Sequence, residues 1–221
     1  RLRAIAEGAA APTAEAAPAV SFLFGEVAVE DFRVLAERVP AVADIAQRSL
    51  DSAPIHAQSP PAARVTAGLV LATLWAESGA RPDAVGGAGA GEVLAACYSG
   101  VLDETEALAL LSWRAGLLDG PPQVRPRGPR VPILSAVVGG ELPESRALDP
   151  LHWTRDVWEG GLLAEAFEGR TADGATVVVV GTPAEPLSAD FGRDGGSESS
   201  PVARLLHDAA RLWTAGVPVD W

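Results

Sequence analysis

The sequence predicts an α/β fold in which a largely parallel sheet is flanked by helices. Two short apolar runs, at residues 20–24 and 176–180, have the length and composition of buried strands. The stretches between them carry apolar residues at helical spacing and alternate with further short apolar runs. Because strands that alternate with helices are typical of crossover connections, the strands are expected to pair in parallel.

The first part of the chain is expected to combine a linker, a strand and an interrupted helix. Residues 1–20 begin with a short helical stretch and continue into an Ala/Pro-rich linker. After the strand at 20–24, apolar positions recur at helical spacing over residues 29–50, with a break at Pro40. The proline-rich residues 52–62 are expected to form a loop.

The next segment is expected to contain a strand, a turn and two helices. A mostly apolar helix is predicted over residues 64–78 and is closed by Gly79. Residues 83–85 are expected to form a strand, residues 86–91 a glycine turn and residues 92–99 a second helix.

A third helix and a connector follow. The helix over residues 103–118 begins with a capping-box pattern, because Asp103 is followed three residues later by Glu106. Residues 120–132 hold five prolines and three arginines and are expected to form an irregular connector.

The last third repeats the alternation of strands and helices. A buried strand is expected over residues 133–138, a helix over 162–167 and an almost purely β-branched strand over 176–180. Residues 190–200 are polar and glycine-rich and are expected to be mobile, whereas residues 202–213 are expected to form an amphipathic helix.

Composition and charge exclude several classes of function. Lys plus Arg number 17 and Asp plus Glu number 29, for a net charge of −12, so no nucleic-acid partner is predicted. No apolar run approaches the roughly 18 residues that cross a bilayer, and no signal peptide is visible, which predicts a cytoplasmic protein without membrane contact. Cys97 is the only cysteine, which excludes an internal disulfide and a cysteine-rich zinc site. No metal or cofactor is predicted.

Three residue types are missing from the sequence. The chain contains no Met, Lys or Asn, so all 17 basic residues are Arg. Lys and Asn have AT-rich codons, and this composition is therefore typical of a protein from a GC-rich bacterium. The missing Met indicates a sequence that begins inside a longer polypeptide or has been processed. Without Lys, neither a Schiff base nor a Walker-type phosphate loop is available.

The glycine turn resembles three chemical motifs without completing any of them. A dinucleotide fingerprint requires a glycine at the position of Glu92, where a carboxylate would repel a pyrophosphate, and a phosphate loop requires Lys. A nucleophile elbow requires Ser or Cys at the apex of its frame. That frame is formed by Gly87, Ala88, Gly89, Ala90 and Gly91. Its apex is Gly89, so the local pattern alone indicates a tight structural turn.

The residues around this turn resemble a known family. Residues 81–85 and 92–96, on either side of the turn, are similar to the acyltransferase domain of modular type I polyketide synthases. Further blocks match in the same order at residues 98–102, 112–114, 130–135, 148–155, 176–181, 211–213 and 216–221. The resemblance implies the hydrolase-like large subdomain of the malonyl-transferase fold over residues 20–189. It also implies an interdomain linker at residues 1–19 and a post-acyltransferase linker with a C-terminal helix at residues 190–221.

The departures from the family pattern imply a degenerate domain without catalytic residues. The nucleophilic serine of the family aligns with Gly89, and the histidine before it aligns with Ala88, which leaves a vestigial elbow. The glutamine-containing loop that the family places after the first strand is missing beyond Phe24. The family also inserts a small ferredoxin-like subdomain, which carries the catalytic histidine, after the helix that bears Arg114. In this chain only the proline-rich connector separates Arg114 from Arg130, so that subdomain is expected to be missing.

One residue matches a functional position of the family. Arg114 corresponds to the arginine that pairs with the free carboxylate of malonyl-type substrates, and a guanidinium suits bidentate binding of a carboxylate. Without the small subdomain, a mainly structural role is expected for Arg114, with retained carboxylate binding as the alternative.

The other chemically capable side chains are interpreted as structural. Surface or packing roles are expected for the three histidines, His56, His152 and His207. Cys97 is interpreted as a small buried hydrophobic residue, and Asp103, Glu104 and Glu106 as a solvated helix start. Core-facing positions are expected for Trp75, Trp113 and Trp213. Positions near connectors, where packing against neighbouring domains is conceivable, are held by Trp153, Trp158 and Trp221.

The preferred hypothesis is a catalytically inactive acyltransferase-like domain of a polyketide synthase. Its role would be structural, between the preceding ketosynthase and the downstream domains. A first alternative is a docking module that recruits a trans-acting acyltransferase or an acyl carrier protein through Arg125, Arg127, Arg130 and Trp221. A second alternative is a repurposed enzyme that binds a malonyl-type carboxylate through Arg114.

Overall fold

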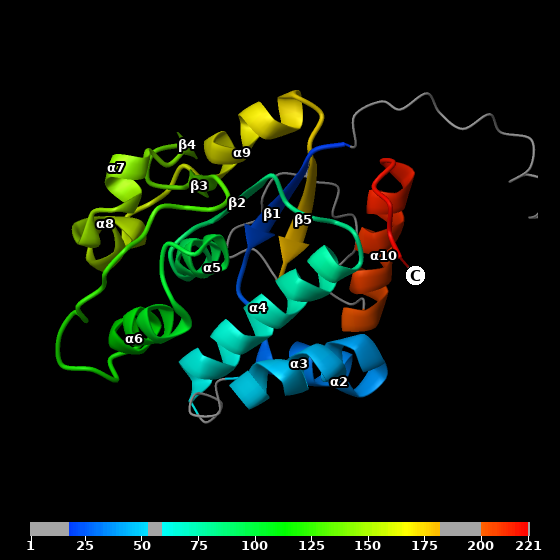
Figure 1. The fold of residues 1–221 in the computed structure, drawn as a ribbon, viewed down its shortest axis with the longest axis horizontal. Coiled ribbons are helices and arrows are strands. Elements are labelled where there is room, and N and C mark those ends of the chain that lie inside the picture. Colours follow the sequence, from blue (N-terminus) through cyan, green and yellow to red (C-terminus); the bar gives the residue numbers. More distant parts are fainter. Residues whose placement is uncertain (1–17, 53–58, 182–199, 221) are drawn as a thin grey trace, which may run out of the picture.

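A sheet of five strands forms the centre of the described part of the chain (Figure 1). The computed structural model describes residues 18–52, 59–181 and 200–220. In spatial order the strands are β4 (Gly140–Glu141), β3 (Ile133–Ser135), β2 (Ala84–Gly87), β1 (Val20–Phe24) and β5 (Thr176–Val180). The only antiparallel pair among these strands is β3 with β4, and the other pairs are parallel. The predicted α/β class with a largely parallel sheet is confirmed.

Helices cover both faces of this sheet. In chain order they are α2 (Val29–Arg38), α3 (Pro40–Ser52), α4 (Pro60–Glu77), α5 (Ala90–Ser99), α6 (Glu104–Arg114), α7 (Glu144–Ala147), α8 (Pro150–Thr154), the 3-10 helix η1 (Asp156–Trp158), α9 (Leu163–Ala172) and α10 (Pro201–Thr214). The side chains of β1 point alternately to the two faces. Phe22 and Phe24 join the larger core with residues of α4 and α5, whereas Leu23 joins a smaller core with residues of α9. In Figure 1, α4 and α5 lie on one face of the sheet and α9 on the other.

The first and the last of the predicted strands in the sequence are confirmed to the residue. β1 and β5 pair in register over their whole length, from Val20 opposite Thr176 to Phe24 opposite Val180. All five residues of β1 are buried, as expected for a parallel strand that is covered on both faces.

Prolines mark two helix starts in the first part of the fold. The predicted break at Pro40 is confirmed, because α2 ends before it and α3 begins with it. The loop predicted over residues 52–62 is wrong at its C-terminal end, where α4 already begins at Pro60. The hydroxyl of Ser59 accepts a hydrogen bond from the backbone N–H of Ala62 at 3.4 Å, and proline is favoured in the first turn because its missing N–H has no partner there.

The predicted capping box is confirmed at the start of α6. The Asp103 carboxylate accepts the Glu106 N–H at 2.9 Å, and the Glu106 carboxylate accepts the Asp103 N–H at 2.9 Å. The helix ends at Arg114, earlier than the predicted residue 118. Gly116 has a left-handed φ of 74°, which closes the last turn and redirects the chain.

Residues 133–158 differ most from the sequence prediction. The strand expected over 133–138 ends at Ser135, because its carbonyl accepts the N–H groups of Val138 and Gly139 in a turn that leads into β4. The short helices α7 and α8 and the 3-10 helix η1 were not predicted. Helices of three to five residues are too short to show an apolar period.

The connector between α6 and β3 contains no helix or strand over residues 115–132, all of which are described. It lies against α5 and the loop after it, since the N–H of Arg127 donates to the Val101 carbonyl and the N–H of Arg130 donates to the Ser99 carbonyl, both at 2.9 Å. Val124 is buried and anchors its middle. The predicted connector is confirmed, and no second subdomain is inserted at this point of the described chain.

The C-terminal helix belongs to the same core as the sheet. α10 packs against α2, and Ala209, Leu212 and Val217 are buried in the larger core. The N–H of Asp220 donates to the Ser78 carbonyl at 2.8 Å, which ties the last described residue to the end of α4.

One expectation for the tryptophans is wrong. Trp213 does not face the core, because it lies on the outer side of α10 with 62% of its surface exposed. The structural role expected for Trp153 is confirmed, because it is fully buried and its Nε1–H donates to the Ala147 carbonyl at 2.8 Å, whereas the alternative of an outer contact surface is excluded. Trp75 is buried, as predicted.

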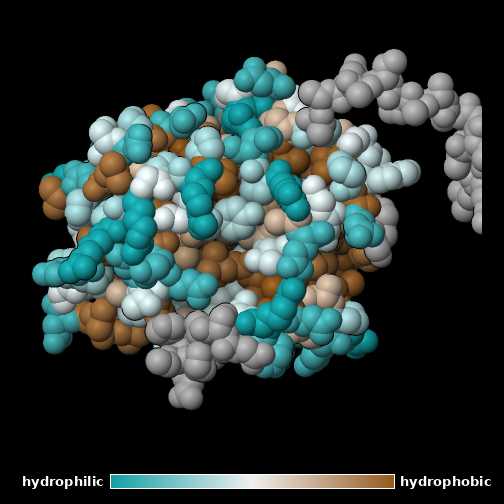
Figure 2. Space-filling view, in the orientation of Figure 1, coloured by the Kyte–Doolittle hydropathy of each residue, from teal (hydrophilic) through white to brown (hydrophobic). Residues whose placement is uncertain are grey.

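Hydrophilic side chains cover much of the face seen in Figure 2, with apolar side chains between them. No helix among the described residues is long and apolar enough to cross a membrane. The expectations for residues 1–17, His56, residues 190–199 and Trp221 lie outside the described part of the chain.

Candidate functional site

The glycine turn connects the end of β2 to the start of α5. Gly89 is the residue before the helix, and its φ of 53° and ψ of −116° are rarely adopted by L-residues. The Gly89 carbonyl accepts the N–H of Val93 at 3.2 Å, and the Ala88 carbonyl accepts the N–H of Gly91 at 2.9 Å. The geometry is that of a sharp strand-to-helix turn with Gly89 at the apex, the shape that a nucleophile elbow requires.

The outer glycines of the frame are required by close packing, whereas the apex is not crowded. A Cβ atom on Gly87 would lie 2.4 Å from the carbonyl carbon of Gly91, and one on Gly91 would lie 2.1 Å from the carbonyl oxygen of Phe24. A Cβ atom on Gly89 would meet nothing closer than Cε3 of Trp158, at 3.8 Å. The turn therefore retains room for a side chain at its apex, although none is present.

Trp158 and Arg114 lie next to the apex. The indole of Trp158 borders the position that a side chain at residue 89 would occupy. The guanidinium carbon of Arg114 lies 5.1 Å from the centroid of the same indole. This distance is within the range of a cation–π interaction. The structure thus brings Arg114, at the end of α6, close to the turn through one tryptophan of η1.

A buried Glu–His pair supports the turn from within. Glu92, in the first turn of α5, is fully buried, and its Oε1 lies 3.1 Å from Nε2 of His152 on α8. Its Oε2 accepts the N–H of Ala136 at 3.1 Å. The His152 ring also packs edge-on against Trp153, with the centroids 4.6 Å apart. One carboxylate therefore links α5, the turn after β3 and α8.

The expectation that His152 is a packing residue is confirmed, but its partner was missed. The two residues are 60 positions apart, and no local spacing relates them. Within the described residues, His152 Nδ1 and Trp158 Nε1 are buried and have no hydrogen-bond partner. His207 is exposed on α10.

Cys97 lies on α5 but is not available as a nucleophile. The thiol is buried, as predicted, and burial together with the nearby carboxylates of Glu104, Asp103 and Glu106 raises its pKa to about 12. Since the thiolate is the reactive form, this cysteine is inert at neutral pH.

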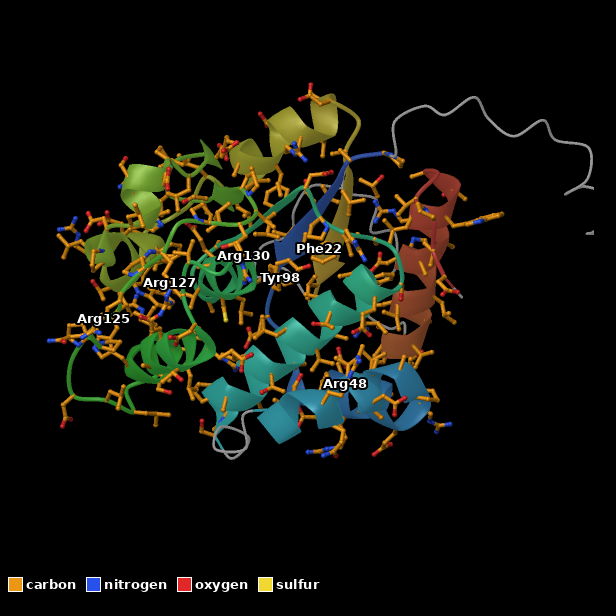
Figure 3. The ribbon with its side chains drawn as sticks, in the orientation of Figure 1. Phe22, Arg48, Tyr98, Arg125, Arg127 and Arg130 are labelled. Atoms are coloured by element: carbon orange, nitrogen blue, oxygen red, sulfur yellow. The ribbon has the colours of Figure 1, made fainter. Side chains whose placement is uncertain are left out.

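The three connector arginines are exposed beside α5 and α6, but they are not equivalent (Figure 3). The Arg127 guanidinium pairs with Glu106 at 3.0 Å and with Asp103 at 3.3 Å, and these hydrogen bonds raise its pKa. Arg130 donates from Nε to the Ser99 carbonyl at 3.4 Å. Arg125 contributes its backbone N–H, which donates to Glu106 at 2.7 Å. Part of the positive charge of this surface is therefore neutralised locally.

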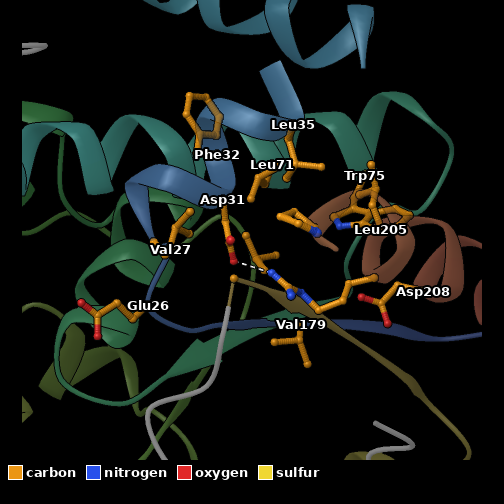
Figure 4. Close-up of a pocket in the computed structure, with 15 residues that line it drawn as sticks. Glu26, Val27, Asp31, Phe32, Leu35, Leu71, Trp75, Val179, Leu205 and Asp208 are labelled. Atoms are coloured by element: carbon orange, nitrogen blue, oxygen red, sulfur yellow. Dashed lines mark hydrogen bonds and ion pairs between the residues drawn. The ribbon is translucent and has the colours of Figure 1, made fainter. Parts of the chain in front are cut away.

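A separate cavity lies near the carboxyl ends of β1 and β5, between α2, α4 and α10 (Figure 4). Its walls combine apolar side chains such as Phe32 and Trp75 with the ion pair between Asp31 and Arg204. The cavity measures about 50 Å³, which holds a few water molecules and not an acyl thioester. Among the described residues, no three His, Cys, Asp or Glu side chains are grouped so that they could hold a metal ion.

Comparisons with other sequences give two partial matches, and no protein-family model matches the chain. The spectinabilin polyketide synthase system protein NorC of Streptomyces orinoci is 31% identical over 156 residues, which are 65% of this chain and 7% of NorC. The chalcone synthase cfoA of Aspergillus candidus is 33% identical over 92 residues, or 41% of this chain and 3% of cfoA. The chain thus spans less than a tenth of the length of either relative.

Nearly the whole of this chain superposes on solved structures. The acyltransferase domain of ZmaA superposes with a TM-score of 0.73 at 16% identity, covering 96% of this chain and 78% of that domain. The acyltransferase domain from module 8 of the salinomycin polyketide synthase gives 0.70 at 19% identity, covering 100% and 82%. FabD from Acinetobacter baumannii gives 0.62 at 14% identity, covering 90% and 100%. The chain therefore has the fold of the acyltransferase domains of polyketide synthases, and part of its sequence is related to a polyketide synthase system protein.

Proposed function

We propose that this chain is an acyltransferase-like domain of a polyketide synthase that does not load acyl groups and has a structural role between neighbouring synthase domains. The observation that carries the proposal is Gly89 at the apex of the turn. An acyl-enzyme needs an oxygen or sulfur nucleophile, and glycine supplies none. The remainder of the turn keeps the shape in which such a nucleophile is presented.

Among the described residues beside the turn, neither Cys97 nor the Glu92–His152 pair replaces the missing nucleophile in this proposal. Cys97 is buried with a pKa of about 12, and the side chains of the buried pair, His152 and Glu92, are 1% and 0% exposed. A base without solvent or substrate access cannot take a proton from an incoming group. In this proposal, neither the thiol on α5 nor the imidazole on α8 takes over the role of the nucleophile missing at Gly89.

The structural role is supported by the contacts that join distant segments of the chain into one core. Glu92 and His152 tie three elements beneath the turn, and α10 joins the same core as the sheet. A docking role through Arg125, Arg127 and Arg130 is the weaker alternative, because Arg127 is already paired with two carboxylates. Carboxylate binding by Arg114 is also the weaker alternative, because its guanidinium stacks on Trp158.

Acyl loading provides the direct test. The purified chain is incubated with malonyl-CoA or methylmalonyl-CoA, and its intact mass is measured beside a competent acyltransferase domain treated in the same way. The expected result is no mass increase for this chain and a stoichiometric acyl adduct for the competent domain. A stoichiometric adduct on this chain contradicts the proposal.

The structural role has its own test in the synthase polypeptide that carries the chain. Replacing the chain with a flexible linker is expected to reduce product formation at least tenfold, whereas Gly89→Ala is expected to leave product formation within twofold. Unchanged product formation after the replacement would show that the domain is dispensable.

A further inference from the structure

We infer that Trp158 is a lid on the apex of the turn, held in place by Arg114, which keeps small molecules away from residue 89. The inference rests on the proposed function: the apex lacks a nucleophile, and the lid in addition restricts access to it. The absence of a side chain at Gly89 does not by itself determine whether small molecules can reach the apex.

The first support is the position of the indole. A Cβ atom at residue 89 would lie 3.8 Å from Cε3 and 4.0 Å from Cζ3 of Trp158. No other described residue beyond the chain neighbours comes within 4 Å of that position. The first atom of any side chain there would be in van der Waals contact with this one aromatic ring.

The second support is the anchoring of the backbone that carries Trp158. Asp156 in η1 pairs with Arg155 at 2.6 Å and with Arg146 at 3.2 Å, and Val157 is fully buried. The N–H of Trp158 donates to the Arg155 carbonyl at 3.3 Å. The 3-10 turn is therefore fixed, and it presents the indole at a defined place above Gly89.

The third support is that the ring itself is held by stacking. Arg114 covers the indole at 5.1 Å, whereas Nε1 has no hydrogen-bond partner among the described residues. A side chain that is fixed at its backbone but not at its polar atom can rotate without breaking a hydrogen bond. The indole is therefore a movable cover on a fixed base.

The chain offers a clean way to measure access to the apex. Cys97 is the only cysteine, and it is buried with a pKa of about 12, so it gives almost no background alkylation. A cysteine introduced by Gly89→Cys lies at the residue before α5, where the helix N-terminus lowers a thiol pKa. Its alkylation rate therefore reports on access to residue 89.

The experiment compares the rates at which iodoacetamide alkylates G89C and G89C/W158A at pH 7.5. Removal of the indole is expected to raise the rate at least tenfold. Matched controls are G89C/W158F, which keeps an aromatic ring at the apex, and G89C/W213A, which removes an exposed tryptophan elsewhere. Both are expected to stay within threefold of G89C. Equal rates for G89C and G89C/W158A overturn the inference.

Local opening has to be separated from unfolding and from failure of the proposed function. Alkylation of Cys97 in parallel with residue 89 would mean that the W158A substitution unfolds the chain, and the lid is then contradicted as a local device. If G89C does not fold, NMR of the unsubstituted apex decides: W158A is expected to shift the Gly89 Hα resonances by at least 0.2 ppm, and no shift overturns the inference. An acyl adduct on the natural chain would contradict the proposed function and leave these rates unaffected.

Discussion

The frame of the glycine turn and its apex differ in how completely they are surrounded. At Gly91, a single added carbon would lie 2.1 Å from the Phe24 carbonyl oxygen, and the next residue, Glu92, is fully buried between two hydrogen-bond partners. At Gly89, an added carbon lies 3.8 Å from one half-buried indole. The outer glycines of the frame are therefore part of the core, while the apex is half-buried and borders a single side chain outside its chain neighbours.

The difference explains how a turn can keep its shape without its chemistry. A residue at the apex contributes little to packing, so its side chain can be lost without disturbing β2 or α5. Gly87 and Gly91 cannot take a side chain without moving the backbone of β1 or α5. Substitutions beneath the turn, in its frame and at its apex are therefore expected to differ in how much they destabilise the fold.

The largest effect is expected from His152→Ala. This substitution leaves the fully buried Glu92 carboxylate without its side-chain partner, and breaking a buried pair costs about 3–5 kcal/mol of unfolding free energy. Urea denaturation measures the loss. His207→Ala, on the exposed side of α10, is the control and is expected to change stability by less than about 0.5 kcal/mol. A loss below about 1 kcal/mol for His152→Ala would mean that the buried pair does not stabilise the turn.

The frame and the apex can be compared directly with two alanine substitutions. Gly91→Ala forces its Cβ into the backbone of β1 and is expected to cost about 2–3 kcal/mol. Gly89→Ala meets no steric clash but has to adopt a φ of 53°, which is expected to cost about 1–2 kcal/mol. Urea denaturation of the two variants ranks them. If Gly89→Ala is the more destabilising, the apex is as much a part of the core as the frame.

The sequence could predict the elements whose signals are local. β1 and β5 follow from short apolar runs, and the start of α6 follows from Asp103 and Glu106, three residues apart. The short helices α7 and α8 lack enough residues to show a period. Local patterns therefore yielded four of the five strands and the longer helices, and they missed β4 and the segment that carries His152 and Trp158.

In the candidate site, too, local features could be predicted from the sequence and long-range contacts could not. The position of Gly89 at the apex follows from the spacing of the glycines, which is a local pattern. The pairing of Glu92 with His152 spans 60 residues, and the contact of Trp158 with the apex spans even more of the chain. Contacts of this kind depend on how α8 and η1 pack against α5, which no single-sequence pattern specifies.

A smaller effect is expected at alkaline pH from Cys97, which lies further along α5. Its pKa is raised by burial to about 12, above the value of roughly 8.5 for an unfolded thiol, so the protonated form is favoured in the folded state. Its contribution is complete below pH 8.5 and is lost as the pH rises toward 12, by up to about 1.4 kcal/mol per pH unit. Urea denaturation at pH 7.5, 9 and 10 should show a steeper decline for the natural chain than for Cys97→Ala. If the unfolding free energies of both proteins declined in parallel, burial would not keep the Cys97 thiol protonated.

The smallest effect is expected at the apex itself, between Arg114 and Trp158. Because the guanidinium is exposed and stacks on a half-buried indole, the interaction is expected to contribute about 0.5–1 kcal/mol. A double-mutant cycle with Arg114→Ala, Trp158→Ala and the double variant, measured by urea denaturation, isolates this coupling from the other contacts of each residue. A coupling near zero would mean that Arg114 does not hold the indole. A coupling comparable to the effect of His152→Ala would place the apex inside the core, and the contrast between apex and frame would then disappear.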